Sequence, residues 1–200
     1  MIKVYGRFSQ IFPPDWVDLY LTLESFHPDY EVSVQQVQRK LLQLEQDVKA
    51  LGFQLTNLQT VDYRITPIYE FDQNVRRLTG FQTTHTLRLS FPLSQGRLNE
   101  TMIRLQSSPS QPLINLTFTI KEREKLKQKL FVGAIDDAES KAIVIANRLG
   151  LKLGSPVKVE EVATPNQRPF RTMAMTEQAV SFTPEGIVLS VELEIHWETL

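Results

Sequence analysis

The chain has 200 residues, of which 42% are hydrophobic and 22% charged, and it carries a formal net charge of −1 and no cysteine. Disulfides, thiol nucleophiles and cysteine-ligated metals are therefore excluded, and the near-neutral charge gives no sign of a nucleic-acid or anionic-lipid partner. The length suits one domain or at most two small ones. The opening MIKVYGRFSQ lacks the apolar run of a signal peptide or membrane helix, so we expect a cytoplasmic protein without a membrane span.

The first quarter of the chain predicts two strands followed by a helix. Apolar residues alternate over 2–8, which predicts one strand, and DWVDLYLTLES over 15–25 predicts a second. A helix follows because apolar residues recur three and four apart, at Val34, Val37, Leu41, Leu44, Val48 and Leu51. Either Asp29 or Ser33 caps the start of this helix, and Gly52 closes its end.

The next part of the chain completes a recognisable order of elements. VDYRIT and FQTTHTLRLSF alternate as strands do, and the residues between them, 67–80, look like the connection of a hairpin. Ser94 caps a second helix, and LINLTFTI forms another alternating strand. Residues 15–120 therefore have the order β-α-β-β-α-β, the split βαβ pattern, which predicts an α+β fold with a mainly antiparallel sheet and helices on one face.

The last part of the chain predicts a long helix over 121–149, a strand around PVKVEEV, a loop over 164–184 and a final strand, GIVLSVELEIHW. Alanine recurs at every fourth position of the helix, at Ala134, Ala138, Ala142 and Ala146. Such a stripe allows close packing, either on the chain's own sheet or against a second subunit. We expect three main helices packed on the sheet and interpret 1–200 as a single domain, with a core over 15–120 and the remainder over 121–200.

Two glycines in KAIVIANRLGLKLGSP raise the possibility of a phosphate-binding loop. Phosphate loops lie between a strand and the helix that follows it, whereas here the helix comes first. The spacing of Gly150 and Gly154 also matches neither nucleotide-binding motif. We therefore expect Gly150 to end the helix and Gly154 to form a turn before Pro156.

The three histidines, His27, His85 and His196, show no metal-ligand spacing. His85 is in phase with core residues of its strand, which favours a buried, hydrogen-bonded side chain, and His196 lies beside Glu194 and Glu198 in the alternation of the last strand. The tripeptide His27-Pro28-Asp29 is typical of a turn from strand to helix. No nucleophile, base and orienting residue occur together, so we expect no catalytic residue, no cofactor and no metal.

Several local motifs together resemble the SIMPL-domain family (domain of unknown function 541). They are VYGRFSQIFPPDWVDLYLTLES, VKALGFQLTNLQTVDYRITPIYE with TGFQTTHTLRLSF, and late in the chain AIDDAESKAIVIANRLGLKLGSPVKVEEV with FTPEGIVLSVELEIHW. The resemblance covers nearly the whole chain. It implies the family's fold, and it carries over no catalytic residue. Many members are exported to the periplasm or envelope and some form ring-like oligomers, but this sequence departs from them because it lacks a leader.

The leading hypothesis is a non-enzymatic protein that associates with itself, with a role in stress or the envelope suggested by family analogy alone. A homo-oligomer needs an interaction surface, and the aromatic and methionine residues outside the predicted core are candidates: Trp16, Tyr20, Phe170, Met173 and Met175. The alternative is a module that binds a small molecule or peptide, with the 164–184 loop as a lid. A hydrolase using His85 or His196 is a third interpretation, which no partner residue supports.

Overall fold

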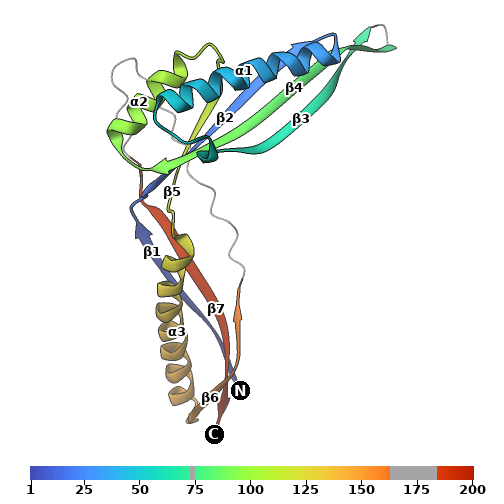
Figure 1. Cartoon of the computed structure of the whole chain (residues 1–200). Helices are drawn as coiled ribbons and strands as arrows, with labels where there is room; N and C mark the ends of the chain where they lie inside the picture. The colour runs from blue at the N-terminus through green and yellow to red at the C-terminus, as the bar shows by residue number, and fades with distance from the viewer. Residues whose placement is uncertain (73–74, 163–183) are drawn as a thin grey trace. The chain divides into compact units, whose positions relative to one another are not determined.

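The computed structural model describes residues 1–72, 75–162 and 184–200, and it divides them into two compact units. The central unit comprises residues 15–72 and 75–119, and the terminal unit comprises 1–14, 120–162 and 184–200. Each unit has its own antiparallel sheet and its own hydrophobic core (Figure 1). The α+β class with antiparallel sheets is thereby confirmed, and the interpretation of the chain as one domain stays a prediction.

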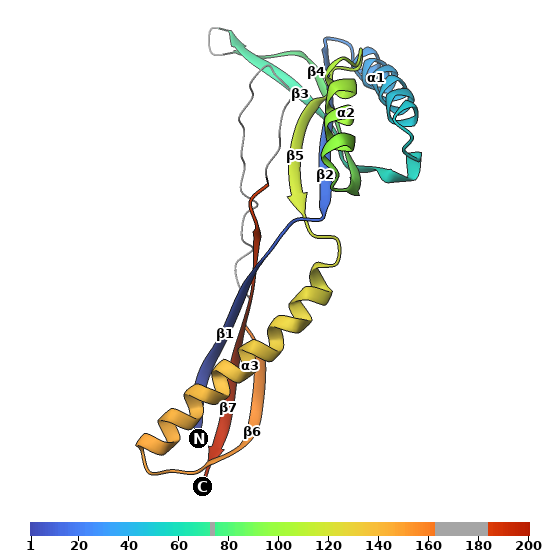
Figure 2. The same ribbon diagram turned by 90° about the vertical axis from the view of Figure 1, so that its left-hand side faces the viewer.

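The central unit has the predicted order of strands and helices. Its elements are β2 (Trp16–His27), α1 (Tyr30–Ala50), the short 3-10 helix η1 (Leu55–Asn57), β3 (Leu58–Asp72), β4 (Val75–Pro92), α2 (Gln95–Gln106) and β5 (Leu113–Thr119). The strands form one sheet in the order β3-β4-β2-β5, with every neighbouring pair antiparallel. α1 and α2 lie on the same face of this sheet (Figure 2), so the split βαβ prediction is confirmed.

The alternating pattern of β2 builds the core of the central unit. Val17, Leu19, Leu21 and Leu23 are all fully buried, and they pack in one cluster with apolar residues of both helices. The intervening residues of β2 face the other side of the sheet, as a period of two requires. Burial of a leucine side chain stabilises a fold by about 1.5–3 kcal/mol, so this strand and the helices above it account for much of the unit's stability.

The ends of α1 decide between the two predicted caps. Asp29 is the N-cap, and its side chain accepts a hydrogen bond of 3.0 Å from the backbone N–H of Val32. Ser33 as the cap was therefore wrong, because Ser33 lies inside the helix, where its buried hydroxyl bonds the hydroxyl of Thr83 at 2.7 Å. At the other end Gly52 has a φ of 77°, a conformation that glycine adopts without strain, as predicted.

The predicted connection at 67–80 differs from the structure. β3 continues to Asp72 and β4 begins at Val75, so most of these residues belong to one long hairpin. The prediction was wrong because a strand on this sheet edge continues through Pro67. Pro67 belongs to β3 and lies opposite Phe81 of β4. Because β3 is an edge strand of the sheet, the missing N–H of a proline is tolerated there.

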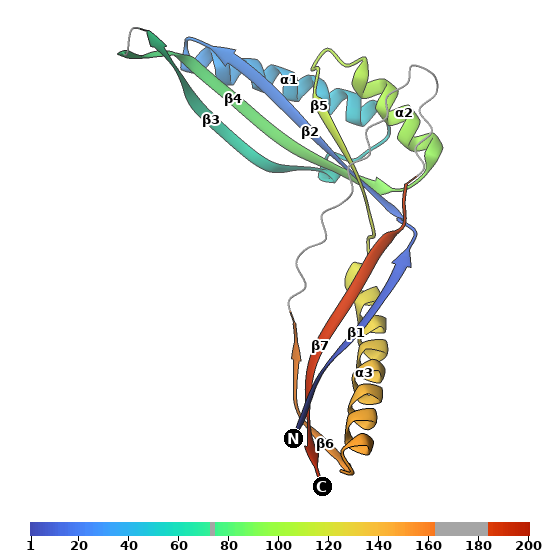
Figure 3. The ribbon, with the colours of Figure 1, turned by 180° about the vertical axis from the view of Figure 1, so that it is seen from behind.

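The terminal unit joins the two ends of the described chain in one sheet. β1 (Ile2–Phe12) pairs antiparallel with β7 (Ile187–Thr199), and β7 pairs antiparallel with β6 (Leu153–Glu161). The order is β1-β7-β6, so β1 and β6 are the edges. The long helix α3 (Arg123–Arg148) runs along β1 and β7 (Figure 3).

The alanine stripe of α3 packs on this sheet. Ala134, Ala138 and Ala142 are fully buried, and Ala146 is nearly so. Gly6 of β1 lies directly beneath, because a Cβ added there would collide with the carbonyl oxygen of Ala134 and the side chain of Ala138. Small residues on both sides therefore bring helix and strand into close contact, and the first of the two predicted alternatives is confirmed.

The two glycines after α3 have different places. Gly150 has a φ of 70° and follows the helix, as predicted, with Leu151 N–H donating back to the carbonyl of Ala146 at 2.9 Å. Gly154 as a turn residue was wrong, because it lies inside β6. The strand begins early because Lys152 and Leu200 exchange two backbone hydrogen bonds, which align the chain with β7 before Gly154 is reached.

Candidate functional site

The structure places two of the five predicted interaction residues. Trp16 and Tyr20 are half-buried on β2, on the sheet face of the central unit that faces away from α1 and α2. Phe170, Met173 and Met175 lie outside the described residues, as does the predicted lid over 164–184 except for Pro184. The structure therefore does not test whether these five residues form one surface.

The sheet face around Tyr20 is polar and well hydrogen-bonded. Tyr20 lies opposite Arg88 of β4 and Asn115 of β5. On the same face the hydroxyl of Ser90 donates to Asp18 Oδ1 at 2.5 Å, and Arg88 Nη2 donates to Gln59 at 2.7 Å. These bonds fix the strands relative to one another, although Arg88 Nε is buried without a hydrogen-bond partner among the described residues.

Two of the three histidines are held in structural contacts within the central unit. His85 is buried, its Nε2 lies 2.9 Å from the hydroxyl of Thr60, and its ring meets that of Tyr63 edge-on. Burial lowers the pKa of His85 because it disfavours the charged imidazolium. His27 Nδ1 accepts a hydrogen bond of 2.9 Å from the backbone N–H of Asp29, in the predicted turn. Both structural interpretations are confirmed.

The third histidine belongs to a charged cluster on the face of the terminal sheet opposite α3. Glu194 Oε1 lies 2.7 Å from His196 Nε2 and 2.8 Å from Lys3 Nζ. Hydrogen bonds from His196, Lys3 and Tyr5, in that order of size, hold the pKa of Glu194 at about 2. A carboxylate with such a low pKa is a weak base at neutral pH, so the cluster suits structural pairing better than proton transfer.

Two side chains of α3 bond backbone groups on the outer edge of β1, at residues 5 and 7. Asp137 Oδ2 accepts a hydrogen bond of 2.8 Å from the backbone N–H of Arg7, and Lys141 Nζ donates to the backbone carbonyl of Tyr5 at 3.0 Å. Asp137 and Lys141 also pair with each other at 2.6 Å, one helical turn apart. We call this arrangement the edge clamp. It occupies backbone groups that would otherwise attract another strand.

The outer edge of β6 lacks such a cover. No strand within the described ranges pairs with it, and every residue from Ser155 to Glu161 is exposed. Val159 lies opposite Ile195, which places its side chain on the α3 side of the sheet, yet 55% of Val159 is exposed. Lys158 and Glu160 point to the other side, opposite His196 and Glu194, and pair with each other at 2.9 Å.

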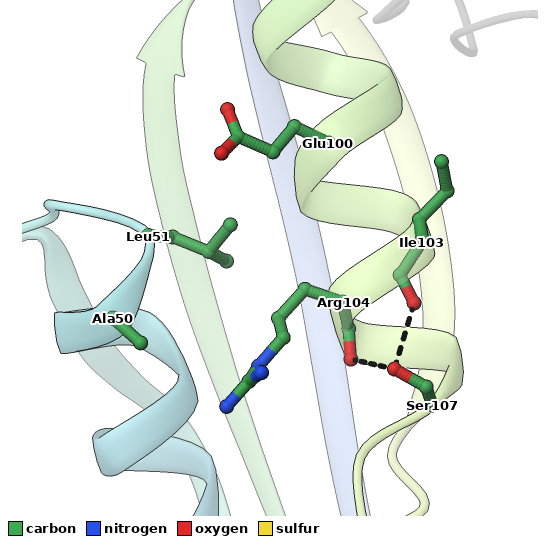
Figure 4. A pocket seen from close by; sticks show the side chains of 6 residues that line it. All are labelled: Ala50, Leu51, Glu100, Ile103, Arg104 and Ser107. Atoms are coloured by element: carbon green, nitrogen blue, oxygen red, sulfur yellow. Dashed lines mark hydrogen bonds between the residues drawn. The ribbon is translucent and has the colours of Figure 1, made fainter.

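A hollow of about 610 Å³ lies between the end of α1 and α2 in the central unit. Figure 4 shows the side chains that line it, which are those of Ala50, Leu51, Glu100, Ile103, Arg104 and Ser107. The hydroxyl of Ser107 donates to the carbonyls of Ile103 and Arg104 at 3.1 Å each. The Ser107 hydroxyl therefore serves the end of α2, and its two described hydrogen bonds go to backbone carbonyls and not to Glu100.

Arg104 of this hollow is fixed by a buried carboxylate. Its Nη2 and Nε lie 2.8 and 2.9 Å from Asp47 Oδ1, and the hydroxyl of Ser108 donates to Asp47 Oδ2 at 2.6 Å. Asp47 is only 1% exposed, so these bonds offset the desolvation of its charge. The network ties α1 to the end of α2, which is a structural role.

No group of three or more histidine, aspartate or glutamate side chains in the described parts of the chain is placed to hold a metal ion. Among the described helices, none is long and apolar enough to cross a membrane.

Sequence reasoning missed the edge clamp and the open edge of β6. The signals were present as an aspartate and a lysine four residues apart on a helix, at 137 and 141, and as opposite charges two residues apart on a strand, at 158 and 160. Neither pattern shows which strand edge it serves, because that depends on the pairing of β1, β7 and β6.

Comparison with known proteins agrees with the resemblance noted in the sequence. The model of the SIMPL family, described as a protein of unknown function (DUF541), matches residues 2–197. A search of curated proteins found no match. Because the family match spans nearly all of the 200 residues, the chain belongs to the SIMPL family.

Proposed function

We propose that this SIMPL-family chain is a non-enzymatic protein that works by associating with itself through the terminal unit. The observation that carries the proposal is the contrast between the two edges of one sheet. On β1 the edge clamp bonds the outward N–H of Arg7 and the outward carbonyl of Tyr5, whereas β6 presents exposed residues and no paired strand within the described ranges. Unpaired N–H and C=O groups on an edge strand are a template for a strand of another chain.

The proposal of a non-enzymatic role is supported by the hydrogen bonds of the three histidines. His85 and His27 bond neighbours within the central unit, and His196 bonds Glu194. General acid–base catalysis needs a group free to exchange a proton with a substrate. A cytoplasmic location, a link to stress or the envelope, and the unity of both units as one domain stay predictions that accompany this proposal.

Light scattering coupled to size exclusion tests self-association directly. At micromolar concentration we expect a mass that is a multiple of 23.0 kDa and that falls on dilution. A mass of 23.0 kDa at every concentration up to the solubility limit would contradict the proposal.

A further inference from the structure

The backbone of β6 has one set of groups directed at β7 and another directed outward. The N–H of Val162 donates to the carbonyl of Glu192 at 2.9 Å, just beyond the end of β6. In an antiparallel pair every second residue bonds the same neighbour, so Glu160 also directs its backbone groups to β7. Val159 and Glu161 therefore direct their N–H and C=O groups away from the sheet.

The side chains along this edge are complementary to an antiparallel copy of themselves. Lys158 and Glu160 lie on one face with Val159 between them on the other. A two-fold axis through Val159 places Lys158 of each copy opposite Glu160 of the other. An axis one residue earlier or later would place like charges opposite each other, which is destabilising. Charge therefore disfavours both neighbouring registers and favours the one centred on Val159.

We propose that two copies of this chain pair antiparallel through β6 about a two-fold axis at Val159, which joins their two sheets into one. This inference rests on the proposed self-association and names its contact. Val159 then exchanges two backbone hydrogen bonds with Val159 of the second copy. Lys158 and Glu160 fall at the non-hydrogen-bonded positions, where side chains are closest, and form two symmetric ion pairs.

A second copy fits this edge better than an unrelated strand does. A two-fold contact uses the same surface twice, so it must be self-complementary, and the order Lys-Val-Glu satisfies that condition. Pro156 and the register shift between Pro156 and Lys158 interrupt the first half of the strand. The contact is thus confined to a short stretch, which predicts a dimer that dissociates on dilution.

Charge reversal at the two positions tests the register. Lys158→Glu gives an edge with two negative charges and Glu160→Lys an edge with two positive charges, so each variant repels its own copies. We expect the mass of each variant in light scattering to fall by up to twofold relative to the unaltered chain, from that of a dimer toward the monomer mass of 23.0 kDa. An equimolar mixture of the two variants should recover the original mass, since the charges of unlike chains are complementary again.

The mixture separates the proposed contact from effects within one chain. Both single variants lose the internal Lys158–Glu160 ion pair, and mixing cannot restore it. Lys129→Glu, an exposed residue of α3, is the matched control and should leave the mass unchanged. If the unaltered chain associates but the single variants keep its mass, or the mixture stays dissociated, the β6 register is wrong while self-association stands.

A disulfide across the axis gives a second, independent measurement. The chain has no cysteine, so Val159→Cys introduces a single thiol whose partner lies on the second copy at a Cα separation of about 5.5 Å. Mild oxidation should produce a covalent dimer on a non-reducing gel. Val144→Cys, which is also exposed, should not cross-link. Equal cross-linking of both variants, or none at position 159 in a chain that associates, would overturn the inference.

Discussion

The two edges of the terminal sheet belong to strands that both pair with β7, but the helix α3 treats their backbone groups differently. β1 lies under α3, and the edge clamp of Asp137 and Lys141 occupies two of its outward backbone groups, although residues 7–11 are exposed. β6 meets the core of the alanine stripe only through Leu153 and α3 through an ion pair of 3.9 Å between Lys127 and Glu161, and its residues 155–161 are exposed. The position of one helix therefore decides which edge is closed and which is available.

The close packing of α3 on β1 is what allows the short side chain of Asp137 to reach the edge. Gly6 lies beneath Ala134 and Ala138, so the helix backbone approaches the strand closely. A larger residue in that contact would raise the helix and withdraw Asp137 from the N–H of Arg7. The difference between the two edges thus depends on the contact of Gly6 with α3 in the core. This contact can be altered without changing Asp137 or Lys141.

Gly6→Ala is the change with the largest expected effect on this difference. The added methyl group collides with the backbone carbonyl of Ala134, which cannot rotate away as a side chain would. We expect a loss of about 3 kcal/mol in the free energy of unfolding, the upper range for overpacking of a core. Urea denaturation followed by circular dichroism measures this change.

Gly96→Ala is the matched control for that experiment. Gly96 lies in the first turn of α2, and no atom is within 4 Å of an added Cβ. Alanine is favoured over glycine in a helix by up to about 1 kcal/mol, so this variant should be unchanged or slightly more stable. If Gly6→Ala were equally harmless, the close contact of α3 with β1 would not be the cause of the difference between the edges.

The sequence predicts the central unit well because its elements follow one another in space. The alternation over 16–27 and the helical stripe over 34–51 each show a buried face, and adjacent elements pack together. The terminal sheet is different, since residues 2–12 pair with 187–199. Alternation identifies both strands but carries no information about their partner, and so the pairing could not be predicted.

The candidate site depends on that same long-range pairing. Trp16 and Tyr20 are found from their place in the alternation of one strand, whereas Val159 matters only because β6 is an edge of the sheet. Ser33 shows that a local pattern can also mislead. Its residue type and position suit a helix cap, but its hydroxyl bonds that of Thr83 on β4. Local sequence patterns therefore predict which face of a strand or helix is buried. Which strand lies at the edge of a sheet, and where a local pattern fails, depends on tertiary contacts.

Removal of the edge clamp should leave the outward backbone groups of β1 without side-chain partners, as those of β6 are within the described residues. In the double variant Asp137→Ala, Lys141→Ala, the N–H of Arg7 and the carbonyl of Tyr5 lose their side-chain partners. Because these groups gain water instead, we expect a loss of only about 1 kcal/mol in unfolding free energy. The mass in light scattering should rise, since both edges of the sheet can then accept a strand.

A mass equal to that of the unaltered chain would show that the clamp does not keep β1 from pairing. Asp136→Ala with Lys129→Ala removes one aspartate and one lysine from exposed positions of the same helix and serves as the control. This control should leave the mass unchanged, because neither side chain is part of the edge clamp.

Acid should weaken the edge clamp by protonating the carboxylate of Asp137. The direction of the pKa shift of Asp137 determines the pH range in which this occurs. The hydrogen bond from Lys141, followed by that from the backbone N–H of Arg7, lowers the pKa of Asp137 in the folded chain. A lowered pKa means that the ionised carboxylate stabilises the fold above the unfolded value of about 3.9, and that this contribution is lost as the pH falls through the folded value. The variant Asp137→Asn tests this expectation because it lacks the charge at every pH.

We expect the unaltered chain to exceed this variant in unfolding free energy at pH 6, and the difference between the two to close below about pH 4, as measured by urea denaturation at low salt. A gap that stays constant down to pH 2 would mean that the clamp depends on the shape of the side chain, and the closed edge of β1 would then be insensitive to charge.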